Sequence, residues 1–121
     1  MLTVSDFEEA VSFYRDALGF EQTADWSSDE GRVVLLEAGR ATIELFDEAQ
    51  AAVVDKIEAG QRVSGPVRLA VEVPDSEATL RRLVEAGASK VAEPVTTPWG
   101  DRNARVEAPD GMQLTLFTPQ A

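Results

Sequence analysis

The chemistry open to this chain is limited first by the side chains it lacks. Among its 121 residues there is no histidine and no cysteine. The chain therefore cannot build a Ser-His-Asp or Cys-His catalytic group, a histidine zinc site, a two-histidine-one-carboxylate iron centre or a thiolate metal site. A disulfide framework is excluded for the same reason. Catalysis would have to depend on carboxylates, arginines, hydroxyl groups and Tyr14.

Net charge limits the partners. The chain has 22 acidic and 11 basic residues, which gives a net charge of −11. Such a surface repels nucleic-acid phosphates and anionic membranes and favours cationic partners. The acidity has two interpretations, which are solubility of the protein and attraction of a cationic ligand. We expect no nucleic-acid partner and no membrane partner. Because no signal peptide or membrane-spanning run is recognisable, we expect a cytoplasmic protein.

Two tryptophans fall in predicted loops, at corresponding places in the two halves of the chain. Packing explains a large flat side chain poorly at Trp26 and Trp99. Near acidic groups, both could stack on a flat or cationic molecule. Cover of a dimer interface would explain them equally well. By contrast, Phe7, Tyr14 and Phe20 are expected in the core.

The order of helices and strands that must position these residues occurs twice along the chain. The first half predicts a strand at 2–4, a helix begun by Ser5 or Asp6 and ended by Gly19, and strands at 21–25, 32–37 and 41–46. The second half predicts a strand at 67–73, a helix over 76–85, and strands at 90–95, 103–108 and 112–117. The inward residues of the two helices are predicted to be Phe7, Ala10, Val11, Tyr14 and Leu18, and then Leu80, Leu83 and Val84.

This order predicts one domain over residues 1–121 with two β-α-β-β-β modules. The first module covers 1–48 and the second covers 66–121. Residues 49–65 join them, with a short surface helix followed by a loop. The fold class is therefore α+β.

The runs that mark both modules resemble those of a known family. LTVSDFEEAVSFYRDALGF, the later PWGDR and the closing APDGMQLTLF resemble the vicinal oxygen chelate superfamily, the group of glyoxalases, bleomycin-resistance proteins and extradiol dioxygenases. The resemblance spans nearly the whole chain. It implies tandem βαβββ modules that form a cupped, eight-stranded mixed sheet around a pocket, and a homodimer. It does not select an activity, because one fold hosts many functions.

The resemblance also marks the positions at which metal-using members hold their ion. These positions fall on Arg68 and Thr115 in the second module and on Glu44 in the first, whose other position lies before Met1. Only Glu44 has a side chain of the usual metal-ligand type. Since a divalent cation needs several such ligands, we expect no metal and no other cofactor. A divalent metal is the alternative.

Glu44 and Arg68 have two interpretations. They could pair with each other, or they could orient a polar ligand, with Arg68 toward an anionic group and Glu44 toward a cationic one. Phe46 and Phe117 are matched ends of the strands that would line the pocket. The predicted ligand-binding residues are therefore Trp26, Glu44, Phe46, Arg68, Trp99, Thr115 and Phe117.

Two function classes follow from the resemblance. The first is a metal-free, non-catalytic protein that sequesters a cationic or aromatic small molecule, such as an antibiotic, and forms a homodimer. The second is an enzyme of the lyase, isomerase or dioxygenase type that uses Glu44 as a metal ligand or as a general base. As a base, Glu44 would need burial to raise its pKa.

Overall fold

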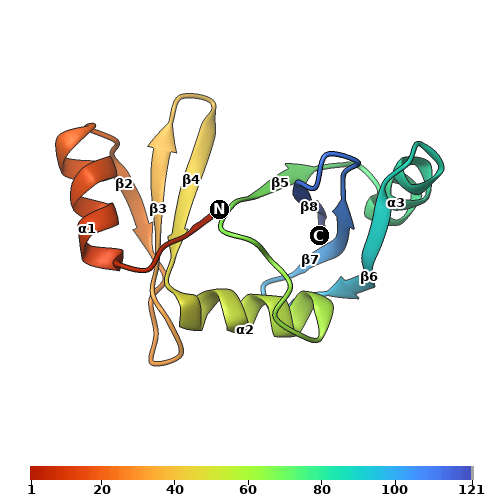
Figure 1. The fold of residues 1–121 in the computed structure, drawn as a ribbon, viewed down its shortest axis with the longest axis horizontal. Helices are drawn as coiled ribbons and strands as arrows, with labels where there is room; N and C mark the ends of the chain where they lie inside the picture. The colour runs from red at the N-terminus through yellow and green to blue at the C-terminus, as the bar shows by residue number, and fades with distance from the viewer. Residues whose placement is uncertain (121) are drawn as a thin grey trace. The chain divides into compact units, whose positions relative to one another are not determined.

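The computed structural model describes residues 1–120, and these residues divide between two compact units. Unit 1 is Met1–Val54 and unit 2 is Asp55–Ala121 (Figure 1). Each unit holds one four-stranded mixed sheet, in the order β1-β4-β3-β2 or β5-β8-β7-β6. The α+β class and the two βαβββ modules are confirmed. The eight strands within residues 1–120 form two hydrogen-bonded sheets of four.

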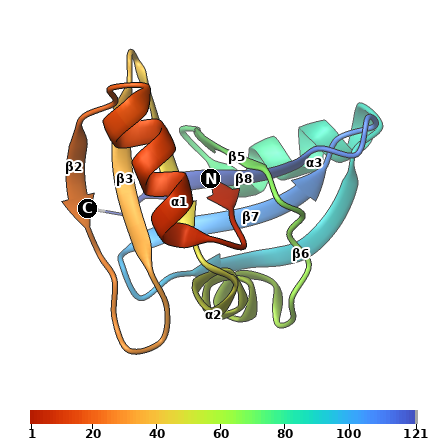
Figure 2. The same ribbon diagram turned by 60° about the vertical axis from the view of Figure 1, so that its left-hand side comes forward.

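Unit 1 follows the predicted order of elements. They are β1 (Leu2–Thr3), α1 (Phe7–Val11), η1 (Ser12–Ala17), β2 (Gln22–Asp25), β3 (Val33–Ala38) and β4 (Ala41–Phe46). Asp6 begins α1, because its carboxylate accepts a hydrogen bond from Glu9 N at 3.0 Å. Strand β1 runs parallel to β4, and the other pairs are antiparallel. Figure 2 shows α1 lying across the sheet formed by these strands.

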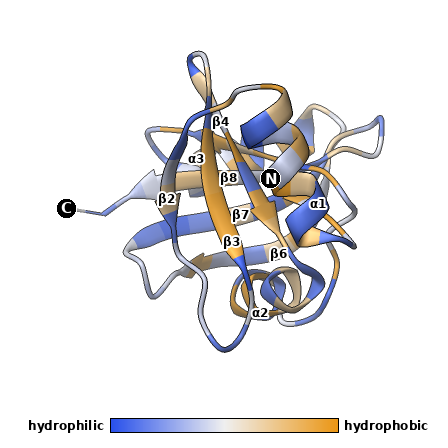
Figure 3. Ribbon diagram, turned by 90° about the vertical axis from the view of Figure 1, so that its left-hand side faces the viewer, coloured by the Kyte–Doolittle hydropathy of each residue, from blue (hydrophilic) through white to orange (hydrophobic). Residues whose placement is uncertain are grey.

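The core of unit 1 lies between α1 and one face of the sheet. Val34, Leu36 and Leu45 alternate along β3 and β4, and all are at most 4% exposed. Phe7 and Val11 pack on them from α1, and Tyr14 and Phe20 pack at the margin of this cluster, as predicted. The apolar character of β3 is plain in Figure 3. Because side chains alternate along a strand, the residues between these three point to the opposite face.

Leu18 was predicted to face the core, and this prediction is wrong. Its side chain is 55% exposed. The helix continues past Val11 as the π-helical segment η1, in which Leu18 N donates to Phe13 O at 2.8 Å, five residues back. A π turn is wider than an α turn, so the residues after it rotate away from the face set by Phe7 and Val11.

The predicted surface helix between the modules is longer and more buried than expected. It is α2 (Glu48–Ala59), which begins after Asp47, whose carboxylate accepts from Gln50 N at 2.8 Å. One side of α2 is buried, with spacing of three or four residues, and carries Ala51, Val54, Asp55 and Glu58. Ala51 and Val54 close a second small core with Val33 and Phe46.

Gly31 allows a close approach between the loop before β3 and α2. It is buried, and a Cβ atom built on it would lie 2.6 Å from Gln50 Cα and still closer to Gln50 N. We expect Gly31→Ala to lower the free energy of unfolding by about 1–3 kcal/mol, as overpacking against backbone does. Urea denaturation would measure this. Gly65→Ala is the control, because its Cβ would meet nothing within 4 Å. An equal effect of both substitutions would contradict the close approach.

Unit 2 repeats the arrangement. Its elements are β5 (Arg68–Glu72), α3 (Ser76–Glu85), β6 (Ser89–Thr96), β7 (Asp101–Glu107) and β8 (Gln113–Pro119). From α3, Leu80 packs on Ala104, Val106 and Leu116. Val84 is 41% exposed, and its predicted inward position is wrong. The contact stripe of α3 runs through residues 76, 79, 80 and 83, which leaves Val84 on its flank.

The helices of residues 1–120 are short, and the longest, α2, has 12 residues. Within this part of the chain no helix is long and apolar enough to cross a membrane.

Candidate ligand-binding site

The candidate site in unit 1 is the face of its sheet that α1 does not cover. In the register of β3 and β4, Leu35 pairs with Glu44 and Val33 pairs with Phe46. Paired residues share a face, so these four side chains lie opposite the α1 core. Phe46 is only 4% exposed, because Ala51 and Val54 of α2 cover it and Val33. This end of the face is therefore closed.

The other end of the same face is open and acidic. Glu44 is half-buried, and the next pair toward the hairpin, Glu37 and Thr42, is exposed. Leu35, half-buried, supplies an apolar floor beside Glu44. Two carboxylates beside an apolar side chain favour a ligand that has both a cationic group and an apolar body. We call residues 35, 37, 42 and 44 the acidic strip.

Both predicted tryptophans lie outside the regular strands and are exposed. Trp26 follows β2, donates from its backbone N to Val33 O at 3.0 Å and is 58% exposed. Trp99 lies in the turn between β6 and β7 and is 50% exposed. At least half of the surface of each residue is therefore exposed. The prediction that they bind a ligand or a second copy stays a prediction.

In unit 2, two of the predicted residues are hydrogen-bonded to each other. Arg68 of β5 donates from Nη1 to Thr115 Oγ1 of β8. The two residues are 5% and 2% exposed. Phe117, two residues along β8 on the same face, is half-buried, and its register partner on β5 is the exposed Glu72. Glu44 belongs to unit 1 and Arg68 to unit 2, so the predicted pairing of these two residues stays a prediction.

Unit 2 also carries a buried ionic cluster, which was not predicted from the sequence. Residues 55–64, which we call the strap, comprise the end of α2 and the loop after it. Asp55 accepts hydrogen bonds from Val63 N and Ser64 N, both at 2.8 Å, and from Ser64 Oγ at 2.6 Å. Arg62 and Arg105 each reach the same carboxylate at 3.0 Å.

Glu58 completes the cluster. Its carboxylate accepts from Arg105 Nε at 2.8 Å and from Asn103 Nδ2 at 3.1 Å. Arg105 is fully buried, while Glu58 and Asn103 are 3% and 4% exposed. Asn103 and Arg105 alternate along β7 with the core residues Ala104 and Val106, so they point away from α3. The cluster thus fastens the strap to the face of the second sheet opposite α3.

One signal in the sequence could have revealed this cluster. In NARVEA, residues 103–108, a polar residue stands at every second position between apolar residues, as in a strand with one apolar and one polar face. A polar face ordinarily meets water. Here it meets carboxylates that are spaced three residues apart on α2, at Asp55 and Glu58. Only the tertiary structure brings these two patterns together.

The pKa of Asp55 connects the cluster to folding stability. Burial alone would raise this pKa, but the hydrogen bonds from Ser64 and Val63 and the charge of Arg105 outweigh burial and hold it well below its ordinary value of 3.8. A carboxyl group whose pKa is lower in the folded chain than in the unfolded chain stabilises the fold. The full stabilisation is present at pH values above the pKa that the group has in the unfolded chain. That stabilisation is lost progressively as the pH falls toward the folded pKa.

We therefore expect Asp55→Asn to be less stable than the parent at pH 7, with a difference that shrinks once the pH falls below about 4. Urea denaturation of both proteins between pH 7 and pH 3 would measure this difference. The comparison isolates Asp55, since other acidic groups titrate alike in both proteins. A difference that stayed constant over this range would contradict the role assigned to its ionised form.

In the second module, the residues at the positions that the resemblance marks for a metal do not fit a divalent cation. In unit 2 they are the guanidinium of Arg68 and the hydroxyl of Thr115, which bind each other. A guanidinium offers only donors, whereas a cation needs lone pairs. Within residues 1–120, no three histidine, cysteine, aspartate or glutamate side chains gather as metal ligands would. The expected absence of a metal stays a prediction.

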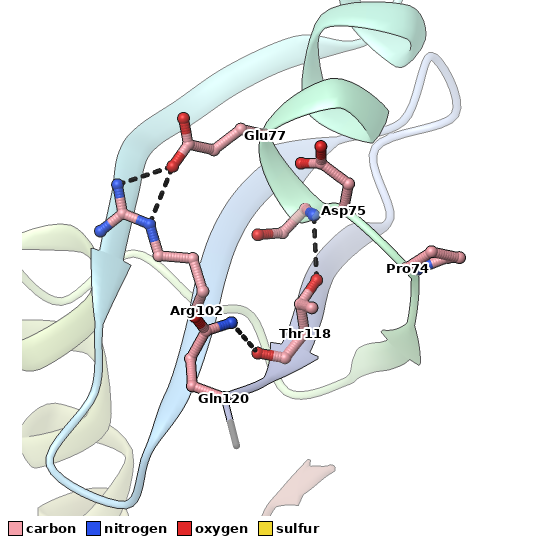
Figure 4. A pocket seen from close by; sticks show the side chains of 7 residues that line it. Pro74, Asp75, Glu77, Arg102, Thr118 and Gln120 are labelled. Carbon is pink, nitrogen blue, oxygen red and sulfur yellow. Dashed lines mark hydrogen bonds and ion pairs between the residues drawn. The ribbon is translucent and has the colours of Figure 1, made fainter.

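An open hollow of about 260 Å³ lies at the start of α3 (Figure 4). Arg102 donates to Glu77 Oε1 from Nε at 2.9 Å, and its Nη2 lies 2.8 Å from the same oxygen. The first module repeats this ion pair, since Arg32 Nη2 lies 2.5 Å from Glu8 Oε1. Because the arginine is neutralised by a carboxylate in both modules, we assign these pairs to anchoring the two helices.

Comparison with known proteins agrees with this fold. The sequence profile of the Glyoxalase/Bleomycin resistance protein/Dioxygenase superfamily matches residues 1–116. No curated protein matches. Among solved structures, a hypothetical protein of Bacillus halodurans C-125 is 19% identical with a TM-score of 0.71, and the match covers 99% of this chain and 91% of that one.

Two further solved structures are similar. Methylmalonyl-CoA epimerase of Mycobacterium tuberculosis is 26% identical with a TM-score of 0.67, over 99% of this chain and 85% of that one. A superfamily member from Vibrio splendidus 12B01 is 21% identical with a TM-score of 0.67, over 97% and 93%. With the profile match and both βαβββ modules in place, the chain belongs to the glyoxalase/bleomycin resistance protein/dioxygenase superfamily.

Proposed function

We propose that this protein binds a cationic small molecule with an aromatic or apolar body, and that it does so without a metal ion. The observation that carries the proposal is the hydrogen bond from Arg68 to Thr115. Metal-using relatives hold their ion at these two positions. Here the positions carry a guanidinium and a hydroxyl, which bind each other and together make a poor cation site. Sequestration of a compound such as an antibiotic requires binding only, and no catalytic group.

The preference for a cation rests on the open end of unit 1. The acidic strip places Glu44 and Glu37 beside Leu35, within a chain whose net charge is −11. A negative field raises the local concentration of cations, and a half-buried carboxylate binds them more strongly than an exposed one. The strip therefore supports recognition of an ammonium or guanidinium group.

The preference for an aromatic or apolar body rests on exposed rings. Trp26 and Trp99 are each at least half exposed, and a tryptophan face attracts cations and stacks on flat rings. In unit 2, Phe117 and Glu72 pair in register and set a ring beside a carboxylate. In unit 1, Trp26 adds an exposed ring at the Val33 end of β3.

Tryptophan fluorescence tests the proposal directly, because the chain has only two tryptophans. The purified protein would be titrated with metal-free bleomycin and with a panel of cationic acridines. Trp26→Phe and Trp99→Phe each leave one reporter, so the pair shows which ring lies near the ligand. We expect saturable quenching for at least one cationic compound and none for its neutral or anionic analogues. Equal quenching by the anionic analogues would contradict the assigned charge preference.

An enzyme is the second candidate, favoured by the 26% identity to methylmalonyl-CoA epimerase. Here Glu44 would act as a general base or metal ligand at a carbon acid. Two features oppose a coenzyme A thioester as the substrate, namely the net charge of −11 and the acidic strip, since both repel its phosphates. Incorporation of solvent deuterium into methylmalonyl-CoA, lost in Glu44→Gln, would support the enzyme and overturn the binding proposal.

A further inference from the structure

The first residue of the module helix differs between the two units. In unit 1, Phe7 begins α1 directly after its cap Asp6. In unit 2, Ser76 begins α3 directly after its cap Asp75. Both first residues are buried, since Phe7 is 7% exposed and Ser76 is 1% exposed. Unit 2 therefore has a small hydroxyl side chain at the position where unit 1 has an aromatic ring.

In unit 1 the ring of Phe7 lies against a guanidinium. Arg32 Cζ is 4.3 Å from the centre of this ring, which is a cation–π contact. The same guanidinium pairs with the second residue of α1, since Arg32 Nη2 lies 2.5 Å from Glu8 Oε1. The ring therefore occupies the space beside the ion pair.

Unit 2 keeps this ion pair, and a hollow lies beside it. Arg102 pairs with Glu77, the second residue of α3, and its Nη1 donates to Thr96 Oγ1 at 3.4 Å. These bonds engage the edge of the planar guanidinium, so its faces remain open to stacking. Arg102 and Ser76 both line the hollow of about 260 Å³ (Figure 4). Within residues 1–120, none of the side chains that line it is aromatic.

The hydroxyl of Ser76 is an independent sign of a ligand. Its Oγ atom is buried and has no hydrogen-bond partner within residues 1–120. The polar groups around it are engaged, since Ser76 N donates to Thr118 Oγ1 at 2.9 Å and this hydroxyl donates to Val73 O at 2.8 Å. A buried polar group without a partner costs free energy, which a polar group of a ligand would recover.

We infer that this hollow binds a neutral one-ring aromatic compound that carries a hydroxyl or carbonyl group. The ring of the ligand stacks on the guanidinium of Arg102, as the ring of Phe7 lies against Arg32 in unit 1. The polar group of the ligand forms a hydrogen bond with Ser76 Oγ. Since a cavity of about 150 Å³ holds a benzene molecule, a hollow of about 260 Å³ admits one ring.

The charges that line the hollow favour a neutral ligand. The carboxylates of Asp75 and Glu77 oppose an anion, whereas Arg102 and the N-terminus of α3 oppose a cation. The acidic strip of the proposed function belongs to unit 1 and favours cations. Binding at the hollow therefore does not depend on the proposed function.

Nuclear magnetic resonance of the full chain tests this binding, with phenol as the probe. We expect saturable chemical-shift changes at the amides of Ser76 and Glu77 and at the Nε–H of Arg102. The dissociation constant should be on the order of 1 mM, as for other very small ligands. Cyclohexanol lacks a π face and benzoate is an anion, so both should bind at least about tenfold more weakly. Phenol that causes no saturable change at these groups, or equal binding of either analogue, would overturn the inference.

Two substitutions of Ser76 separate the roles of the hollow and the hydroxyl. Ser76→Phe gives unit 2 the residue that unit 1 has at this position, so the new ring should fill the hollow and abolish phenol binding. Ser89→Phe, at an exposed position of β6, is the control and should bind phenol as the parent does. Ser76→Ala keeps the hollow, so it should weaken phenol binding about fivefold and leave toluene binding unchanged. Unchanged phenol binding in Ser76→Ala, or in a Ser76→Phe variant that circular dichroism shows to be folded, would overturn the inference.

Discussion

Replacing Arg105 by methionine is expected to lower the free energy of unfolding by about 3–5 kcal/mol. Arg105 is fully buried and binds both Asp55 and Glu58, at 3.0 and 2.8 Å. Methionine preserves much of the volume but leaves the buried carboxylate of Glu58 with only the amide of Asn103, and that of Asp55 with Arg62 as its remaining cation. An uncompensated buried charge costs far more than the loss of an exposed ion pair. Urea denaturation at pH 7 would measure the difference from the parent.

The structure offers a matched control for this substitution. Arg102→Met also removes an arginine of β7 and its ion pair, but the side chains of Arg102 and Glu77 are 34% and 47% exposed. The expected cost there is below about 1 kcal/mol. A triple variant, in which Asp55 and Glu58 are also made leucine, should recover much of the stability, because no buried charge remains. Equal effects of the Arg102 and Arg105 substitutions would contradict the fastening role of the strap cluster.

Replacing Glu44 by glutamine is expected to weaken binding of a cationic ligand about tenfold, which is about 1.4 kcal/mol. Glu44 is the half-buried carboxylate of the acidic strip, paired in register with Leu35. Glutamine keeps the shape and removes the charge. The loss should therefore be confined to cationic compounds. Isothermal titration calorimetry with the best compound of the fluorescence panel, and with its neutral analogue, would measure the effect.

Glu85→Gln is the control for net charge, since Glu85 is exposed at the end of α3 and lies in the other unit. It should change the affinity by less than twofold. The effect of Glu44→Gln should also diminish at high salt, because salt screens the interaction that the substitution removes. An unchanged affinity in Glu44→Gln, or an equal loss in both variants, would exclude the acidic strip as the binding surface.

Much of this fold could be predicted because the local signals agree with one another. The bounds of α3 match the predicted 76–85, and those of β4 match 41–46. Each follows from a strong local pattern. Asp75 caps the start of α3, and β4 is an apolar run that follows a glycine turn. The doubled pattern also predicted that the two modules would have the same order of elements, and both are βαβββ.

The rest could not be predicted, because it depends on the contacts between elements. Leu18 has the spacing of an inward helical residue. However, the π-helical turn that precedes it rotates its side chain away from the core face of α1. Asp55 and Glu58 are ordinary surface residues of a helix until Arg105 of a distant strand lies beneath them. Phe46 is predicted as a ligand contact, which stays a prediction, but the sequence did not show that α2 covers its side chain. The helix covers it because Gly31 permits α2 to approach so closely.

The proposed function depends most on binding without a metal. The decisive measurement is the affinity of the protein for its best cationic compound after treatment with a chelator, together with elemental analysis of the same sample. We expect a metal content well below one equivalent and an affinity that neither chelation nor added divalent cation changes. Loss of binding on chelation, restored by one equivalent of a divalent cation, would contradict the proposal. It would mean that the protein holds an ion although Arg68 and Thr115 make a poor cation site.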